Sequence, residues 1–128
     1  MSDAIGGGLG ERAVRVVPPG ASLLVKSGFY EGLEVPVDRD WVVIGRGRGA
    51  DVVIAQPSIS RAHAAVGYAE DGFFVQDLGS TNETLVNGAK TQKAALKNGD
   101  EIRMGKLTVG VSLPSDSSNS SDSMSAGS

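Results

Sequence analysis

Short apolar segments separated by turn dipeptides run through the sequence from about residue 21 and restrict the folds open to it. Each segment combines aliphatic or aromatic residues over the length of a β-strand, and no stretch makes a convincing helix. Asn87-Gly88 and Asn98-Gly99 favour tight turns, and residues 70–72 are typical of a hairpin turn. About ten short strands are therefore predicted, among them residues 22–26, 33–37, 41–45, 52–54, 62–68, 72–77, 84–86, 101–104 and 106–113.

This pattern favours an all-β fold in which the strands form a β-sandwich. The 18 glycines suit a fold with many tight turns and are too many for a helical bundle. With 128 residues, the chain has room for one domain of ordinary size.

The two ends of the chain differ in composition from its middle. Residues 1–20 are rich in glycine and proline without a lasting period, which predicts a flexible leader. Residues 114–128 are almost entirely serine, aspartate, asparagine and glycine, so we expect a disordered Ser-rich tail that buries too little apolar surface to fold. The folded domain is then predicted to span residues 21–113.

Composition also excludes several classes of function. The chain has no cysteine and a single histidine, which argues against disulfides and against a metal site. No apolar run reaches the roughly 18 residues of a membrane-spanning helix, and the N-terminus lacks the features of a secretory signal. A net charge of -3 argues against sequence-independent nucleic-acid binding. We therefore expect a cytoplasmic protein without a membrane or nucleic-acid partner.

Positive charge nevertheless gathers in one stretch of the sequence. Between residues 43 and 63, Arg46, Arg48 and Arg61 stand against a single acidic residue, Asp51. An anion-binding function is therefore to be sought there.

Two constellations resemble catalytic motifs and fail on chemical grounds. The glycine-arginine loop at residues 45–49 leads into another predicted strand, whereas a phosphate-cradling loop needs a helix behind it and a P-loop also needs a following lysine and hydroxyl residue. Ser60 and His63, offset by three residues near a strand, are expected on opposite faces and out of reach of each other. A buried histidine bonded to backbone is the preferred interpretation. The sequence thus predicts no enzyme, no cofactor and no metal.

Three segments, taken together and in order, resemble the forkhead-associated (FHA) domain family: residues 44–46, residues 58–63, and residues 77–82 leading on to 86–88. The resemblance covers nearly all of residues 22–112. It implies a sandwich of two antiparallel sheets with about eleven strands, in which loops at one end bind phosphothreonine peptides.

The resemblance also implies roles for individual residues. The residues expected to face the phosphate are Arg46, Ser60, Arg61 and Thr81. Asn82 is expected to hold the peptide backbone. A guanidinium fork suits phosphate oxygens, and an asparagine amide both donates and accepts hydrogen bonds. The residues expected to support the binding loops are Gly45, His63, Asn87 and Gly88.

One residue departs from the family pattern, which usually has glycine where this chain has Glu83. Glutamate tolerates a positive φ poorly, so Glu83 is expected either to distort the turn that presents Asn82 or to bring a carboxylate near an anionic ligand.

The predicted function is phosphorylation-dependent protein-protein interaction in signalling, and the alternative is an FHA-like scaffold whose contacts do not depend on phosphate. The partner is expected to be another chain, a Thr-phosphorylated substrate of a Ser/Thr kinase, because residues 1–20 and 114–128 contain no threonine.

Overall fold

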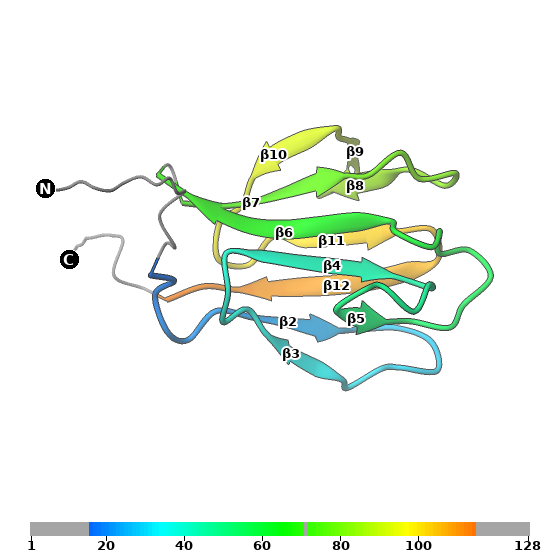
Figure 1. Cartoon of the computed structure of the whole chain (residues 1–128), viewed down its shortest axis with the longest axis horizontal. Coiled ribbons are helices and arrows are strands. Elements are labelled where there is room, and N and C mark those ends of the chain that lie inside the picture. Colours follow the sequence, from blue (N-terminus) through cyan, green and yellow to red (C-terminus); the bar gives the residue numbers. More distant parts are fainter. Residues whose placement is uncertain (1–15, 71, 115–128) are drawn as a thin grey trace, which may run out of the picture.

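A computed structural model describes residues 16–70 and 72–114, so most of the expected leader and tail lies outside the described residues. The described chain forms eleven strands and no helix (Figure 1). The strands are β2 (Ser22–Val25), β3 (Glu34–Pro36), β4 (Trp41–Gly45), β5 (Val52–Val53), β6 (Ala64–Ala69), β7 (Gly72–Asp77), β8 (Thr84–Val86), β9 (Ala89–Lys90), β10 (Lys93–Ala95), β11 (Glu101–Met104) and β12 (Leu107–Ser112). No helix in this part of the chain is long and apolar enough to cross a membrane.

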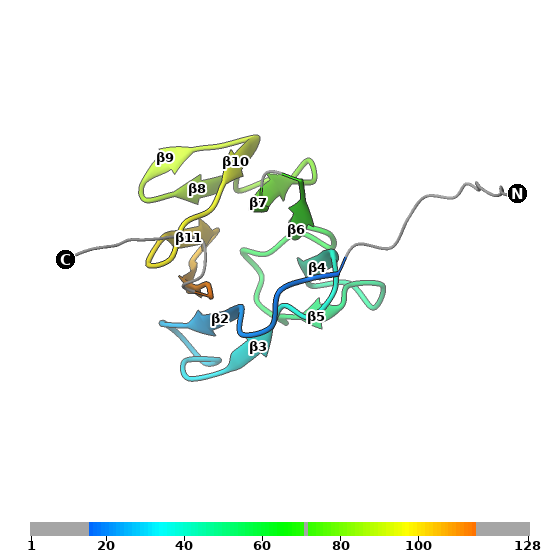
Figure 2. The same cartoon turned by 90° about the vertical axis from the view of Figure 1, so that its left-hand side faces the viewer.

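The strands form two sheets that lie face to face, as Figure 2 shows. One sheet has the order β10-β7-β6-β4-β5 and the other the order β3-β2-β12-β11-β8-β9. The predicted β-sandwich is therefore confirmed. The core between the sheets follows the two-residue alternation of the strands: in β11, Ile102 and Met104 are fully buried while Glu101 and Arg103 are exposed.

The expectation of purely antiparallel sheets needs one correction, because β5 pairs with β4 in parallel. After β4 the chain doubles back along that strand, where the Asp51 N–H donates to the Val43 carbonyl at 2.8 Å and the Asp51 carboxylate accepts from the Val43 N–H at 2.8 Å. The chain then runs in the direction of β4 again, so Val52 lies opposite Ile44.

Two of the eleven strands, β9 and β10, lie outside the segments expected from the sequence. Both are short, and all their residues except Ala94 are exposed. β9 forms a hairpin with β8, the strand directly before it, so that Val86 lies opposite Ala89, whereas β10 pairs with the earlier strand β7, placing Lys93 opposite Gln76.

The direction of the strands gathers five loops at one end of the sandwich, on the right in Figure 1. Strands β2, β4, β7 and β11 end there, and β6, β8 and β12 begin there. The loops at this end comprise residues 26–33, 46–51, 54–63, 78–83 and 105–106. All five residues expected to bind ligand, and His63 among those expected to support them, thus come from neighbouring loops.

Candidate functional site

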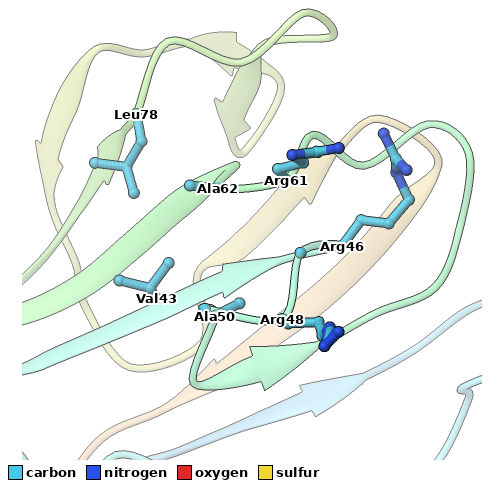
Figure 3. Close-up of a pocket in the computed structure, with 9 residues that line it drawn as sticks. Val43, Arg46, Arg48, Ala50, Arg61, Ala62 and Leu78 are labelled. Carbon is cyan, nitrogen blue, oxygen red and sulfur yellow. The ribbon is translucent and has the colours of Figure 1, made fainter.

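Hydrogen bonds fasten the loop after β4 to the loop before β6. The backbone N–H of Arg46 donates to the Ser60 carbonyl at 2.9 Å, and that of Gly47 donates to the Arg61 carbonyl at 3.0 Å. The Arg46 side chain uses its Nε to donate to the Ile59 carbonyl at 2.9 Å. The guanidinium is thereby held at its base, and its exposed terminal N–H groups are left for a ligand (Figure 3).

Gly45 is required by the closeness of these two loops. A Cβ atom at Gly45 would overlap the Arg61 carbonyl, so a larger residue would push the loops apart. The φ angle of Gly45 is not positive. Glycine is therefore required here by the close approach of the two backbones and not by an unusual φ angle.

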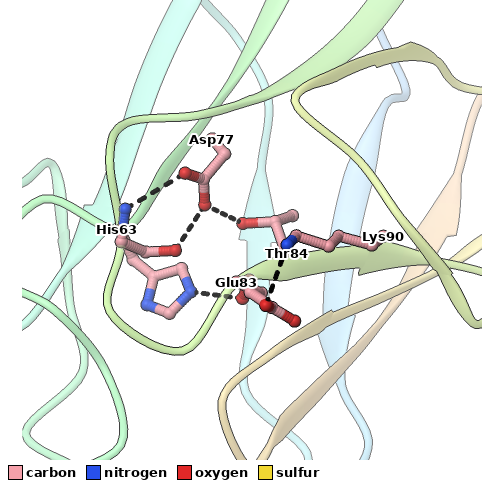
Figure 4. Close-up of polar contacts among 6 residues, drawn as sticks. His63, Asp77, Glu83, Thr84 and Lys90 are labelled. Atoms are coloured by element: carbon pink, nitrogen blue, oxygen red, sulfur yellow. Dashed lines mark hydrogen bonds and ion pairs between the residues drawn. The ribbon is translucent and has the colours of Figure 1, made fainter.

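His63 joins the loop before β6 to the loop before β8. The ring is fully buried, its Nδ1 accepts from the Ser60 backbone N–H at 3.1 Å, and its Nε2 lies 2.8 Å from the Glu83 carbonyl (Figure 4). Because a carbonyl only accepts, Nε2 must carry the proton and Nδ1 the lone pair. The expected buried histidine bonded to backbone is confirmed, whereas the expectation that Ser60 and His63 lie out of reach of each other is wrong, because the Ser60 backbone N–H reaches the ring.

Asp77 organises the loop that follows β7. Its carboxylate accepts from the backbone N–H groups of Gly79 at 2.9 Å and Ser80 at 3.0 Å, and from the hydroxyl groups of Ser80 at 2.5 Å and Thr84 at 2.7 Å. Burial raises the pKa of this carboxyl, but the hydrogen bonds from the side chains of Ser80 and Thr84 and from the backbone of Ser80 and Gly79 outweigh burial and hold the pKa below its usual value. The sequence analysis missed this role, although Asp-x-Gly-Ser is typical of an aspartate that caps its own turn.

The remaining expected binding residues lie beside this frame. The Thr81 N–H donates to the Ser60 hydroxyl at 3.0 Å, which leaves that hydroxyl free to donate its own proton. The Asn82 side chain donates through Nδ2 to the Ser58 carbonyl at 2.9 Å, and Ser58 accepts from the Lys106 N–H through its hydroxyl at 3.0 Å. Ser58 is therefore a second anchor that the sequence analysis did not identify.

Glu83 occupies the turn without breaking these contacts. Its φ is 60°, the left-handed region that favours glycine, and Asn82 still reaches Ser58. The Glu83 carboxylate pairs with Lys90 at 3.1 Å, and both side chains are half-exposed or more. The turn thus keeps these contacts although a non-glycine residue adopts a left-handed conformation in it, and Lys90 partly neutralises the charge of Glu83.

Asn87 and Gly88 form the expected turn, with φ angles of 50° and 87°. Their expected support of the binding loops needs correction, because the Asn87 side chain donates to Asp100 at 3.0 Å and accepts from the Glu101 N–H at 2.9 Å. These contacts fix the start of β11, whereas the binding loops adjoin its end.

The electrostatics of the loop end are positive. Within residues 16–70 and 72–114, no ion pair joins Arg46, Arg48 or Arg61 to a carboxylate. The same residues contain no group of three His, Cys, Asp or Glu side chains placed to hold a metal ion. The arrangement therefore offers exposed donors and positive charge, which suits an anionic ligand.

Comparison with known proteins agrees with this geometry. The family model described as the FHA domain matches residues 42–105. The glycogen accumulation regulator GarA of Mycobacterium tuberculosis is 36% identical over 97 residues, which is 75% of this chain but only 60% of that protein. An oxoglutarate dehydrogenase inhibitor of Corynebacterium jeikeium is also 36% identical over 97 residues, 75% of this chain and 67% of that protein.

Among solved structures, one from a structural and functional analysis of phosphothreonine-dependent FHA domain interactions superposes with a TM-score of 0.68. It is 29% identical, and the match covers 74% of this chain and 97% of that one. By its motifs, its fold and these relatives, this chain belongs to the FHA domain family.

Proposed function

We propose that this domain binds segments of partner proteins that contain phosphothreonine, and thereby mediates phosphorylation-dependent interactions in signalling. The observation that carries the proposal is the loop end itself, where Arg46, Ser60 and Asn82 are held in place by backbone contacts while keeping groups free for a ligand. The FHA domain described above, studied for its phosphothreonine-dependent interactions, supports the same class of ligand.

The chemistry of the free groups fits a phosphate. A phosphothreonine carries about -1.5 to -2 charges near neutral pH and three strong acceptor oxygens. The terminal N–H groups of Arg46, the hydroxyl of Ser60 and the exposed side chain of Arg61 are the donors offered to it, with the exposed hydroxyl of Thr81 beside them. Hydrogen bonds to charged groups are worth about 1.5–3 kcal/mol each, so two or three of them decide whether a peptide binds.

We propose that Asn82 holds the backbone of the peptide. Its Nδ2 donates to the Ser58 carbonyl at 2.9 Å, which restricts the orientation of the amide group, and Asn82 is exposed. An amide oxygen accepts hydrogen bonds, so it suits a backbone N–H next to the phosphothreonine.

We further propose a regulatory role in the cytoplasm and not a catalytic one. The two relatives are a regulator and an inhibitor by name, and a binding module that acts on other chains fits such a role. The absence of cysteine is compatible with a reducing compartment.

A binding titration with one threonine peptide, phosphorylated and unmodified, tests the proposal. We expect micromolar or tighter binding of the phosphorylated form alone, and a loss of at least about 30-fold in Arg46→Ala, the equivalent of about 2 kcal/mol. Lys97→Ala is the matched control, since this exposed charge lies in the loop after β10, at the opposite end of the sandwich. Equal binding of both peptides would favour a scaffold whose contacts do not depend on phosphate.

A further inference from the structure

Beside the proposed phosphate position lies an open pocket of about 770 Å³. Its apolar lining comes from Val43, Ala50, Ala62 and Leu78, and its positive rim from Arg46, Arg48 and Arg61 (Figure 3). Both glycines of the loop after β4 complete the lining. The pocket thus combines an apolar floor with three guanidinium groups.

Arg48 is the arginine that the proposed phosphate site does not use. Its side chain is exposed, and no carboxylate in the described part of the chain pairs with it. The nearest acid in sequence, Asp51, does not line the pocket, and its carboxylate accepts from the Val43 N–H at 2.8 Å and lies 3.4 Å from Arg39. The positive charge of the rim is therefore left without a counter-charge from neighbouring residues.

The pocket also lies to one side of the expected peptide path. Asn82 and Ser58, which hold the peptide side of the site, line a different pocket of about 310 Å³, and the two pockets have no lining residue in common. Two of the proposed phosphate ligands, Arg46 and Arg61, line the larger pocket, while Ser60 lines neither, so the proposed phosphate position lies at the edge of the larger pocket. Arg48 lines this pocket without being one of the proposed phosphate ligands, so it is available to a second group of the same ligand.

We infer that this pocket is a second anion-binding position, in which Arg48 favours phosphothreonine segments that carry another phosphate or carboxylate within a few residues. The inference rests on the function proposed above. Charge complementarity carries it: the first phosphate is assigned to Arg46 and Arg61, and Arg48, which lines the same largely apolar pocket, is the guanidinium group that remains for a second anion. A neutral occupant would leave this charge unmatched.

A peptide series tests the inference by fluorescence anisotropy at low salt. The series keeps one phosphothreonine in a neutral sequence and adds a second phosphoserine, or in a parallel arm a glutamate, at each position up to four residues before or after it. We expect a gain of about threefold to tenfold at one or more positions on one flank, which is the range of exposed to partly buried charge pairs. The gain should shrink as ionic strength rises.

Two variants assign the gain to this pocket. Arg48→Ala should remove it while leaving the affinity for the singly phosphorylated peptide within about twofold, and Lys97→Ala should change neither value. Gly49→Glu is the second variant, because Gly49 lines the pocket, has no positive φ, and a Cβ there meets nothing within 4 Å. The added carboxylate should abolish the gain without disturbing the fold.

The outcomes separate this inference from the function on which it rests. If no phosphothreonine peptide binds the unaltered protein, the proposed function fails. If the singly phosphorylated peptide binds but no second anion improves binding, or if the gain survives both Arg48→Ala and Gly49→Glu, the second position is refuted and the proposed function stands. A gain in the phosphate arm alone would support the inference and identify a doubly phosphorylated segment as the ligand.

Discussion

The substitutions Asp77→Ala and Asp77→Asn measure how much the Asp77 carboxylate, which organises the loop before β8, contributes to the stability of the domain. Alanine removes an acceptor that serves two backbone N–H groups and two hydroxyl groups. Gly79 is exposed, so water can replace the lost partner there, but Thr84 is fully buried and its hydroxyl would be left unsatisfied. A buried unsatisfied group costs about 1–3 kcal/mol, and with the partly buried Ser80 N–H we expect Asp77→Ala to lose about 2–4 kcal/mol of unfolding free energy.

Asparagine should cost less, for a specific reason. Its amide oxygen can take the place of Oδ2 and keep both backbone N–H groups, while its NH2 group faces the hydroxyls of Ser80 and Thr84, which can accept as well as donate. The charge is lost, and charge-assisted hydrogen bonds are roughly twice as strong as neutral ones. We therefore expect a loss of about 1–2 kcal/mol.

The pH dependence supplies an independent check on the same carboxylate. Because the pKa of Asp77 is lower in the folded than in the unfolded protein, the unfolded state binds more protons between the two values, and stability rises with pH there. The contribution is complete above the unfolded value of about 3.9 and is lost as pH falls below it. The stability difference between the unaltered protein and Asp77→Asn should therefore narrow on acidification.

Urea unfolding from about pH 7 down to about pH 3, followed by the fluorescence of Trp41, measures both effects. Asp38→Asn is the control, since this exposed aspartate pairs with Arg39 at 3.7 Å on the surface and should shift stability by less than about 0.5 kcal/mol. A cost below about 1 kcal/mol for Asp77→Ala, or a difference for Asp77→Asn that does not change with pH, would refute the reasoning.

Two further substitutions test the backbone of the site. Glu83→Gly should raise the unfolding free energy by about 0.5–1 kcal/mol in urea titrations, because glycine adopts the observed φ of 60° without strain; unchanged or lower stability would contradict this. Gly45→Ala should destabilise the domain by about 2 kcal/mol or more and weaken phosphopeptide binding, because the new Cβ meets the Arg61 carbonyl; a variant with unaltered melting temperature and affinity would show that the loops separate at no cost.

Local signals account for the parts of the fold that could be predicted from the sequence. The bounds of β4, β7, β8 and β11 match the expected segments because apolar residues and Asn-Gly turns mark them. The strands β9 and β10 lack apolar segments, since their residues are mostly exposed; β9 pairs with β8 directly before it, and the partner of β10 is the earlier strand β7. The parallel pairing of β5 likewise depends on the return of the chain at Asp51, which no local pattern encodes.

The candidate site likewise contains residues that the sequence predicts and residues that it does not. Its motif residues Arg46, Ser60 and Asn82 could be named from the sequence through the family resemblance. The anchor Ser58 could not, because its hydroxyl and carbonyl meet Lys106 and Asn82 from loops 48 and 24 residues away in the chain. Asn87 illustrates the opposite case, in which a recognisable motif residue stabilises the start of β11 instead of the ligand loops.

The central claim, that the loop end captures a phosphothreonine, is tested most directly by an NMR titration of the ¹⁵N-labelled protein with a phosphothreonine peptide and its unmodified twin. We predict large amide shifts at Arg46, Ser60, Thr81 and Asn82 with the phosphorylated peptide and none with the other, while the amides of residues 97–99, at the opposite end of the sandwich, stay in place. Equal shifts with both peptides, or shifts centred on residues outside the five loops, would contradict the claim.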